Sequence, residues 1–596
     1  MCGIVGYIGQ SATKKLLEKL RCLEYRGYDS SGIAGLKSGE IKVKKSLGNI
    51  SNLEKILGQD DDIDYGIAHT RWATNGDVSI QNAHPHISFD GNWALVHNGI
   101  IENADKLREG LVKHGISFVG QTDSEVVVNL LAIEKGKTIE RIYNVCKKLK
   151  GSWAFAVINK NESNKIFIAK KSSPLYFSFS PSCVCVASDP CCFEGRVYFD
   201  LKDDSIGEVS LGKNTIYDRS FKKVIAKRHV LKEKEEASKE DYKYFMLKEI
   251  NETKPALDKL IKLYSDKKIF SKIDRSFLQG IKSIKIIGCG TAYNSGLIGG
   301  QYLEKTLDIE SSGFIASEFR YSCPIINKNT LCIFVSQSGE TADTLGCLSL
   351  AKQRKAKVIS LTNVMYSSLA GQSKNVLPIS AGKEVAVAST KAYTCQLAVF
   401  YLLSAYLKDI KENSRLNYAR AINNLRHVLK VIDSIDFSEL EALSEDLKNA
   451  GNVFFLGRGL DYFTALEASL KLKEVSYINS NAYPTGELKH GYLALIEKDV
   501  PVIVFATQKN LLDKTINGIN EIHSRGGKVI LITPFEIDLT GNNIKIVRID
   551  NSVFLQKELY PLISIIYAQY LAFFTSIKKG INPDQPRNLA KSVTVE

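Results

Sequence analysis

A repeated pattern of strand, turn and helix in the second half of this 596-residue chain constrains its fold more than any other feature. An apolar run that ends in a glycine turn and leads into a helix occurs at 285–291 and again at 453–459. A fixed offset of about 170 residues between matching runs indicates two copies of one fold. Alternating strands and helices predict that each copy is a doubly wound parallel sheet. The other matching runs are 331–336 and 357–362 in the first copy, and 501–506 and 528–533 in the second.

The first part of the chain has a different pattern. Short β-rich runs broken by Gly, Asn and Asp, with helices near 12–23 and 124–131, predict an α+β domain. A segment dense in Lys and Glu, 222–240, is typical of a linker. The chain is therefore expected to be a multidomain protein that combines α+β and α/β folds. The predicted parts are a first domain at 1–225, a linker at 226–250, α/β domains at 251–430 and 431–580, and a carboxy-terminal segment at 581–596.

Composition narrows the function classes. A net charge of +14, from 79 basic and 65 acidic residues, favours anionic ligands such as phosphates, or reflects solvated lysine-rich faces. No basic stripe with interleaved aromatics suggests a nucleic-acid partner. Twelve scattered cysteines without a secretory signal favour reduced thiols in a cytoplasm. The most apolar stretch, 559–574, contains Pro561 and Gln569, which predicts a buried helix and no membrane partner.

Cys2 is a candidate nucleophile at the amino terminus. Removal of Met1 would leave Cys2 with a free α-amine, whose pKa of about 8 suits a base for the thiol proton. Taken alone, such a cysteine is more often a small buried residue. Cleavage of an amide also needs donors for an oxyanion, which Asn98 and Gly99 could supply. The alternative for this Asn-Gly pair is a hairpin turn.

Arg71 and Asp123 suit a free amino acid as substrate. An arginine can grip the carboxylate of the amino acid with two hydrogen bonds, and an aspartate can meet its ammonium group. The alternative for these two residues is an ordinary surface pair.

Together these segments resemble the class II glutamine amidotransferases, which are amino-terminal-nucleophile hydrolases, and in particular their glucosamine 6-phosphate synthase branch. The resemblance implies a four-layer αββα glutaminase, with Cys2 as nucleophile and Asn98 and Gly99 as the oxyanion hole. It implies that glutamine is bound by Arg71, Trp72, Thr74 and Asp123, with Trp72 in the mobile loop that gates ammonia. Asn75 stands where the family normally has histidine, which bears on the affinity for glutamine. The segments that carry the resemblance are 2–6, 23–30, 69–74, 82–86, 96–103 and 122–125.

Histidine and cysteine groups suggest other chemistry less strongly. His84 and His86 have a spacing that metal ligands can have, but no further pair lies at an interpretable distance, so no metal is expected. The run from Cys183 to Cys185 alternates as a β-strand, and we interpret these residues, with Cys191 and Cys192, as strand cysteines.

A phosphate site is predicted directly after the apolar run 331–336 of the first copy. The segment 335–344 combines an apolar strand, a turn rich in hydroxyls and a helix start, an arrangement that binds phosphate through hydroxyls and backbone N–H groups. A helix cap is the alternative, but it explains only one hydroxyl of Ser336, Ser338 and Thr341. A nucleotide is disfavoured, since neither a Walker lysine nor a Gly-x-Gly-x-x-Gly motif is present. The second copy has fewer hydroxyls, at 506–508.

The second copy has acid–base groups instead. Glu467, Lys471 and Glu474 share one face of a predicted helix at 465–476. The alternative is a set of surface ion pairs worth roughly 0.3–0.5 kcal/mol each. The loops at strand ends of such sheets face the ligand crevice, which favours a functional role.

These segments, with 486–491 and the carboxy-terminal 584–596, resemble the sugar isomerase (SIS) fold in two copies, as in the isomerase half of the same synthase family. The resemblance implies that Glu474 moves a proton between C1 and C2, that His490 of a neighbouring subunit opens the sugar ring, and that Lys591 forms an imine. Glu467 and Lys471 would support the site. Ala292 and Tyr492 depart from the family pattern, which has Ser and Pro there. The implied phosphate ligands are Ser336, Gln337, Ser338 and Thr341, helped by Thr291 and Ser389.

The expected activity is therefore transfer of ammonia from L-glutamine to D-fructose 6-phosphate inside a cytoplasmic homodimer, without a metal or redox cofactor. An amidotransferase with a phosphoribosyl acceptor would share only the first half of the chain. A non-catalytic sugar-phosphate sensor would share the SIS half, but would not need Glu474, His490 and Lys591 together.

Overall fold

The chain divides into two compact units in the computed structural model, which describes residues 2–58, 61–73, 75–193, 197–230, 238–539 and 543–593. The first unit comprises Met1–Glu236 with Ala590–Glu596, and the second comprises Ala237–Leu589. The first therefore contains the predicted α+β domain, and the second contains both predicted α/β copies.

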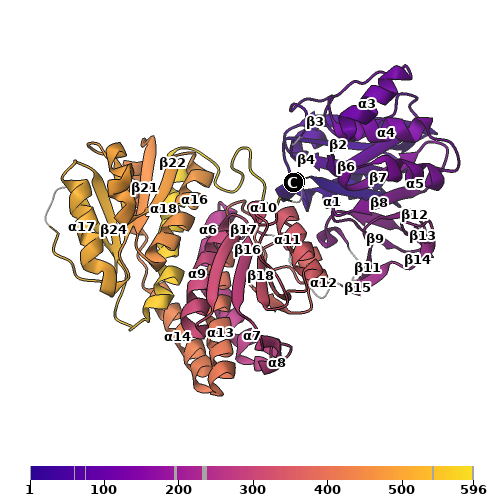
Figure 1. Cartoon of the computed structure of the whole chain (residues 1–596). Coiled ribbons are helices and arrows are strands. Elements are labelled where there is room, and N and C mark those ends of the chain that lie inside the picture. Colours follow the sequence, from indigo (N-terminus) through magenta and orange to yellow (C-terminus); the bar gives the residue numbers. More distant parts are fainter. Residues whose placement is uncertain are drawn as a thin grey trace. The chain divides into compact units, whose positions relative to one another are not determined.

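Two antiparallel sheets form the first unit within the described residues (Figure 1). The larger sheet has, in spatial order, β15 (Lys227–Val230), β11 (Val197–Asp200), β9 (Tyr176–Phe179), β10 (Val184–Ala187), β1 (Gly3–Ile8), β4 (Tyr65–Arg71), β2 (Ser30–Lys37) and β3 (Glu40–Leu47). The other sheet has β14 (Lys223–Val224), β13 (Lys213–Tyr217), β12 (Ser205–Ser210), β8 (Ile166–Lys171), β7 (Gly151–Asn159), β6 (Trp93–Ile101) and β5 (His86–Ile87).

Alternating side chains make these sheets the middle of four layers. Ile4 of β1 and Val96 of β6 share one buried cluster between the sheets. Val5 faces the opposite way and packs with Leu16 of α1, because successive side chains of a strand point to opposite faces. Leu95 likewise packs outward with the helices on the second sheet. The expected αββα arrangement is confirmed. The helices of this unit are α1 (Ala12–Arg21), α2 (Ile50–Ile56), α3 (Ala104–Lys113), α4 (Asp123–Ile133) and α5 (Thr138–Lys148).

The second unit contains two parallel sheets of five described strands each, and both have the second strand at one edge and the first strand next to it. The first is β17 (Glu310–Ile315), β16 (Ser283–Gly288), β18 (Thr330–Ser336), β19 (Lys357–Thr362) and β20 (Val376–Pro378). The second is β22 (Asn479–Pro484), β21 (Asn452–Gly457), β23 (Pro501–Phe505), β24 (Lys528–Thr533) and β25 (Ile544–Arg548). The repeat predicted from the apolar runs is confirmed in strand order and direction.

Helices cover both faces of each of these sheets. In the first copy, apolar side chains of α9 and α13 pack on one face and those of α10, α11 and α12 on the other. In the second copy, α16 and α18 cover one face and α17 the other. The helices are α6 (Phe245–Asn251), α7 (Thr253–Ser265), α8 (Arg275–Leu278), α9 (Thr291–Leu307), α10 (Ala316–Phe319), α11 (Ala342–Gln353), α12 (Ser368–Gln372), α13 (Lys391–Glu412), α14 (Leu416–Asp433), α15 (Ser438–Leu447), α16 (Leu460–Ser476), α17 (Leu512–His523) and α18 (Tyr560–Lys578).

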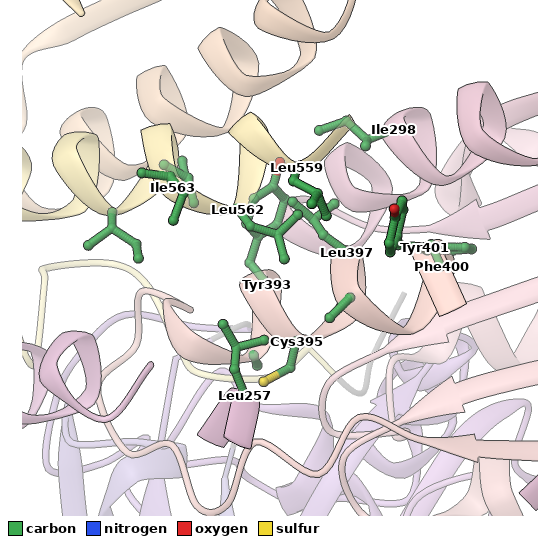
Figure 2. Close-up of a cluster of buried hydrophobic side chains, with 14 of the residues drawn as sticks. Leu257, Ile298, Tyr393, Cys395, Leu397, Phe400, Tyr401, Leu559, Leu562 and Ile563 are labelled. Carbon is green, nitrogen blue, oxygen red and sulfur yellow. The ribbon is translucent and has the colours of Figure 1, made fainter. Parts of the chain in front are cut away.

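One apolar cluster joins the two copies. Figure 2 shows side chains of α13, such as Leu397, beside Leu562 and Ile563 of α18, all of them buried. The segment Lys557–Lys578 is apolar and long enough to cross a membrane, but 89% of its most apolar window is buried in the protein. The prediction of a buried helix over 559–574 is confirmed.

The segment predicted as a linker, 226–250, contains two regular elements. Its start includes β15, which pairs with β11, and its end includes α6, whose Met246 is buried in the core of the second unit. The sequence pattern predicted neither element. For β15 the reason is that the side chains of Lys227, Arg228 and Val230 are exposed on an edge strand, so the segment is typical of a solvated linker. Residues 231–237 lie outside the described residues, and the domain boundaries stay predictions.

The packing in Figure 2 predicts that Leu562→Ala destabilises the second unit by about 2–5 kcal/mol, because it leaves a cavity where two helices meet. Hydrogen exchange of the α13 and α18 amides measures this loss. All three tryptophans, Trp72, Trp93 and Trp153, lie in the first unit, so their fluorescence should report unchanged unfolding there. Leu416→Ala, at a leucine with 71% exposure, is the matched control and should have little effect.

Candidate active site

The strand order of the first copy reverses at one place. The chain runs outward in opposite directions from β16 and β18, and ligands of such sheets bind outside the carboxyl ends of the strands where the order reverses. Thr291 follows β16 at this edge, and Ser336 ends β18. The predicted phosphate residues and the start of α9 therefore follow the carboxyl ends of these two neighbouring strands.

Hydroxyls and backbone donors converge in the turn after β18. The Ser336 and Thr341 hydroxyls are 3.1 Å apart, and the Gly339 N–H donates to Ser336 Oγ at 2.9 Å. The Glu340 N–H donates to Ser338 Oγ at 3.2 Å. Thr341 precedes α11, but its side chain makes no capping hydrogen bond, so the helix-cap alternative is wrong for this residue. Gly339 has φ of 69°, a left-handed conformation that glycine adopts without strain and that lets the chain turn tightly after β18.

The acidic helix predicted in the second copy is α16, and its charges are buried. Lys471 Nζ lies 3.4 Å from Glu467 Oε1 and 2.6 Å from Glu474 Oε2. The side chains of Glu467 and Lys471 are fully buried, and that of Glu474 is 19% exposed. The alternative of surface ion pairs is therefore wrong, and Glu474 is the member of the trio that solvent or a ligand can reach.

Residues of the first copy complete this charge cluster. Thr291 Oγ1 donates to Glu467 Oε1 at 2.9 Å and accepts from Lys471 Nζ at 3.1 Å. Asn294 Nδ2 donates to Glu467 Oε2 at 2.8 Å. Thr291 thus uses its hydroxyl to join α9 to α16, a role that the predicted phosphate contact did not include.

Burial and pairing oppose each other in this cluster. Burial raises the pKa of Glu467, although Lys471 and the Asn294 amide favour its charged form. Burial alone would lower the pKa of Lys471, but the two carboxylates outweigh it and raise that pKa, so Lys471 stays charged. A fixed cation therefore stands next to Glu474.

The second copy has a carboxylate where the first has an alanine. Asp461 lies four residues after the glycine that ends β21, as Ala292 lies four residues after the glycine that ends β16. Asp461 Oδ2 accepts the Thr507 N–H at 2.8 Å, and its other oxygen accepts the Thr507 hydroxyl. Burial raises the pKa of Asp461 to about 6. An internal carboxyl group thus takes the donors that an anion would need there, in line with the expectation that only the first copy binds phosphate.

The loop around Ser389 and the start of the carboxy-terminal segment are tied together. Ser389 Oγ donates to Glu384 Oε2 at 2.8 Å. The Val387 N–H donates to the Asp584 carbonyl at 3.1 Å, and the Arg587 N–H donates to the Tyr477 hydroxyl, at the end of α16, at 2.7 Å. This segment is therefore fixed between the Ser389 loop and the end of α16.

Two other predicted residues, His490 and Lys591, belong to other segments of the chain. His490 is exposed at the end of the 3₁₀ helix η5 (Thr485–His490), and Tyr492 stacks on Tyr483 with ring centroids 3.6 Å apart. Lys591 belongs to the segment Ala590–Glu596, which groups with the first unit. The roles of His490 and Lys591 stay predictions.

In the first unit, strand register brings Cys2 to the end of β4. Gly3 pairs with Thr70, so Cys2 lies beside Arg71. The Trp72 N–H donates to Cys2 Sγ at 3.4 Å. Burial raises the pKa of the Cys2 thiol, which favours its neutral form until a base removes the proton.

Asn98 and Gly99 lie inside β6 rather than in a turn, so the hairpin alternative is wrong. Asn98 Nδ2 donates to the Cys2 carbonyl at 2.9 Å, which places an amide donor next to the thiol residue. Gly99 has φ of 131°, and a Cβ atom there would lie 2.1 Å from the Ser152 carbonyl oxygen. Only glycine therefore permits this close approach of β6 to β7.

Arg71 and Asp123 are both buried, so the alternative of a surface pair is wrong. Asp123 begins α4 and accepts the Ile101 N–H at 2.8 Å. The Arg71 guanidinium donates to the carbonyls of Asn75, Gly76 and Asp77, so the following loop wraps around it. Thr74 lies outside the described residues.

The histidines near this site pair with each other and with neutral groups. His84 Nδ1 is 3.0 Å from His69 Nδ1, and His86 Nε2 is 2.9 Å from Thr122 Oγ1. Within the described ranges, no group of three or more His, Cys, Asp or Glu side chains is arranged to hold a metal ion. Cys185 lies in β10, as predicted, whereas Cys191 and Cys192 lie in the 3₁₀ turn η3 (Pro190–Cys192), because Pro190 cannot donate to a β-ladder. That part of the strand interpretation was wrong.

Several side chains that contact the candidate sites were not predicted from the sequence. Asp29 Oδ2 accepts the Ala73 N–H at 2.8 Å and so fixes the loop that carries Trp72. His69 and Asn294 contact the candidate residues Asn98 and Glu467, and Asp461 accepts the Thr507 N–H. His69 and Asn294 lie in or beside segments that the sequence analysis named. Asp461 could have been found from its match to Ala292 within the repeat.

Comparisons with known proteins agree with this division of the chain. The glutamine amidotransferase domain family matches residues 69–194, and the SIS domain family matches 277–406 and 446–574. The chain is similar to the glutamine–fructose-6-phosphate aminotransferases (isomerizing) of Clostridium tetani, at 42% identity, and Caldanaerobacter subterraneus, at 40%, with 100% of both chains covered in each case. A solved carboxy-terminal domain of the glucosamine–fructose-6-phosphate aminotransferase from Francisella tularensis is 35% identical, with a TM-score of 0.55, over 59% of this chain and 100% of that one.

The buried charge cluster predicts that Lys471→Met lowers the free energy of unfolding by about 3–5 kcal/mol, because Glu467 keeps a buried charge without its partner. The raised pKa of Glu467 makes protonation favour the folded state, so the loss should be smaller at pH 5 than at pH 8. Hydrogen exchange of the α16 amides measures it. The double variant with Glu467→Gln should recover part of the loss, and an equal loss at both pH values would contradict this account.

Proposed function

Because the chain belongs to the family of glutamine–fructose-6-phosphate aminotransferases, we propose that Cys2 releases ammonia from L-glutamine and that the SIS half adds it to D-fructose 6-phosphate. The protein is an amidotransferase whose products are D-glucosamine 6-phosphate and L-glutamate. The observation that carries the assignment is full-length identity of 40–42% to enzymes of this name, across both halves. The sensor alternative has no comparable support.

For the glutaminase reaction, the α-amine of Cys2 takes the thiol proton after removal of Met1, and the thiolate attacks the glutamine side-chain carbonyl. Asn98 Nδ2 and the Gly99 N–H stabilise the oxyanion that forms. Collapse releases ammonia and leaves a thioester on Cys2, which water hydrolyses to glutamate. The hydrogen bond from Asn98 to the Cys2 carbonyl supports this role, since the same donor lies within reach of an oxyanion next to Cys2.

Arg71 and Asp123 bind the two charged groups of glutamine in this proposal, with Trp72 and Thr74 in the covering loop. The carbonyls of that loop, which accept from Arg71 in the ligand-free chain, would give way to the substrate carboxylate. A charge-assisted bidentate pair is stronger than hydrogen bonds to neutral carbonyls, and this difference favours the exchange.

In the SIS half, Ser336, Gln337, Ser338 and Thr341 bind the sugar phosphate, with Thr291 and Ser389 nearby. Lys591 forms an imine with the open-chain ketose, and ammonia then replaces Lys591 as the nitrogen of that imine. Glu474 carries a proton from C1 to C2 to give the amino sugar. The exposure of Glu474 beside a buried, charged Lys471 supports its role as the mobile base.

The remaining parts of the proposal concern assembly and place. An exposed His490 is available to a second copy of the chain, and we expect a homodimer in which it opens the sugar ring. Ammonia passes internally, because free ammonia would largely be protonated in water. The cytoplasm supplies both substrates, and neither a nucleic acid nor a membrane takes part.

Cys2→Ala should abolish glutamate release from glutamine while isomerisation of the sugar phosphate continues, because the proposal assigns the two chemistries to different side chains. Incubation with both substrates, followed by assays of glutamate and hexosamine phosphate, measures this. Cys323→Ala, at an exposed thiol, is the control and should behave as wild type. Loss of both activities in folded Cys2→Ala protein would contradict the separation, and glutamate without hexosamine phosphate from wild type would contradict the synthase assignment.

Ala292→Ser should lower the KM for fructose 6-phosphate by about two- to tenfold, since one added neutral hydrogen bond contributes about 0.5–1.5 kcal/mol. The matching Asp461 reaches the loop after β23, so a side chain at 292 is expected to reach the phosphate loop after β18. Steady-state kinetics measures the change. Ala292→Val adds bulk without a hydroxyl and should not lower the KM, so an equal decrease in both variants would contradict the prediction.

A further inference from the structure

We propose that His69 is a positioning residue for the glutaminase reaction: it holds the Asn98 amide with its nitrogen toward Cys2. This inference rests on the proposed oxyanion role of Asn98. It assigns a task to a buried histidine that neither the thiol chemistry nor the sugar chemistry uses.

The hydrogen bonds define each partner in turn. Asn98 Nδ2 donates to the Cys2 carbonyl at 2.9 Å, so Asn98 Oδ1 points the other way, where it lies 3.1 Å from His69 Nε2. His69 Nε2 also lies 3.0 Å from the His97 carbonyl oxygen. These two oxygens can only accept, and therefore His69 Nε2 carries the hydrogen.

His84 packs against the same ring. Its Nδ1 lies 3.0 Å from His69 Nδ1 and 3.2 Å from His69 Nε2, and the two rings meet edge to face at an interplanar angle of 86°. The hydrogen bonds that orient the amide therefore run from His69 to Asn98 and from Asn98 to the Cys2 carbonyl.

Burial disfavours protonation of His69 and His84. His69 has no exposed surface, and that of His84 is 5%. Burial lowers the pKa of His69 to about 3 and that of His84 well below its ordinary value. Burial therefore favours the neutral form of both rings, and a neutral His69 with hydrogen on Nε2 can donate to Asn98.

Fixing the Asn98 amide matters because its two ends differ in chemistry. With nitrogen toward Cys2 the side chain donates to an oxyanion, whereas a rotated amide would present an oxygen that repels it. Loss of one oxyanion donor costs about 10²–10³ in kcat in a studied protease. Removal of His69 leaves the donor in place but frees its rotation, so a smaller loss, about tenfold or somewhat more, is expected on the same basis.

The experiment compares His69→Leu, His69→Gln and Asn98→Ala in the full-length protein, with glutamate release measured in the presence of fructose 6-phosphate. His69→Leu should lower kcat about tenfold or more and change the KM for glutamine by less than about twofold, because the positioning acts on the transition state. His69→Gln should keep most of kcat, since the glutamine amide nitrogen can replace Nε2 as donor. Asn98→Ala should lose more than His69→Leu, and combining the two should add no further loss.

Controls separate this inference from loss of folding and from the oxyanion proposal itself. His114→Leu, at an exposed histidine directly after α3, should behave as wild type. If His69→Leu does not fold, as judged by tryptophan fluorescence, His84→Leu serves instead and should lower kcat, because it removes the ring that packs against His69. Wild-type kcat in the folded leucine variant, or equal losses for leucine and glutamine, would overturn the positioning role. Wild-type kcat in Asn98→Ala would overturn the oxyanion role instead.

Discussion

A buried lysine between two carboxylates is the interaction on which the SIS half depends. Lys471 and Glu467 are fully buried on α16 of the second copy, and Glu467 is satisfied by Thr291 and Asn294 on α9 of the first. A buried charge that loses its partner is strongly destabilising, so α16 can keep this face only while α9 packs against it. The cluster that links Thr291 to Glu467 and Lys471 therefore forms only when both copies are joined. This requirement gives a physical reason for two copies within one chain.

The two copies keep the same sheet but differ where the strands end. In the first copy Ala292 has no polar side chain, and the Ser336 hydroxyl contacts Thr341 and Gly339 within its own turn. In the second, Asp461 occupies the matching position and takes the donors of Thr507. A single side chain four residues after a strand thus distinguishes the strand ends of the two copies. The copies could diverge in chemistry because these strand-end side chains contribute little to the apolar core.

The elements could be predicted from sequence because their signals are local. Apolar runs and glycine turns predicted the six central strands, and helical spacing predicted that Glu467 and Glu474 share a face. The linker ends were harder, since β15 is an edge strand whose exposed lysine and arginine resemble a solvated segment. The Asn98-Gly99 pair has a local preference for a turn, which the pairing of β6 with β7 overrides.

Contacts between distant segments could not be predicted in the same way. Glu467 meets residues 173 and 176 positions away, and His69 meets an asparagine 29 positions away. Periodicity gives no information about which buried polar group will partner which, because that choice depends on how whole elements pack. The resemblance to a family indicated candidate residues, but it indicated Thr291 for phosphate and left its bond to Glu467 unseen.

Burial has opposite consequences at the two candidate sites. Around Cys2 it favours the neutral forms of two histidines and the thiol: it lowers the pKa values of His69 and His84 and raises that of Cys2. Around Glu474 it is offset by pairing, so that Lys471 remains a fixed cation. Burial thus leaves a neutral thiol at one candidate site and a permanent positive charge beside Glu474 at the other.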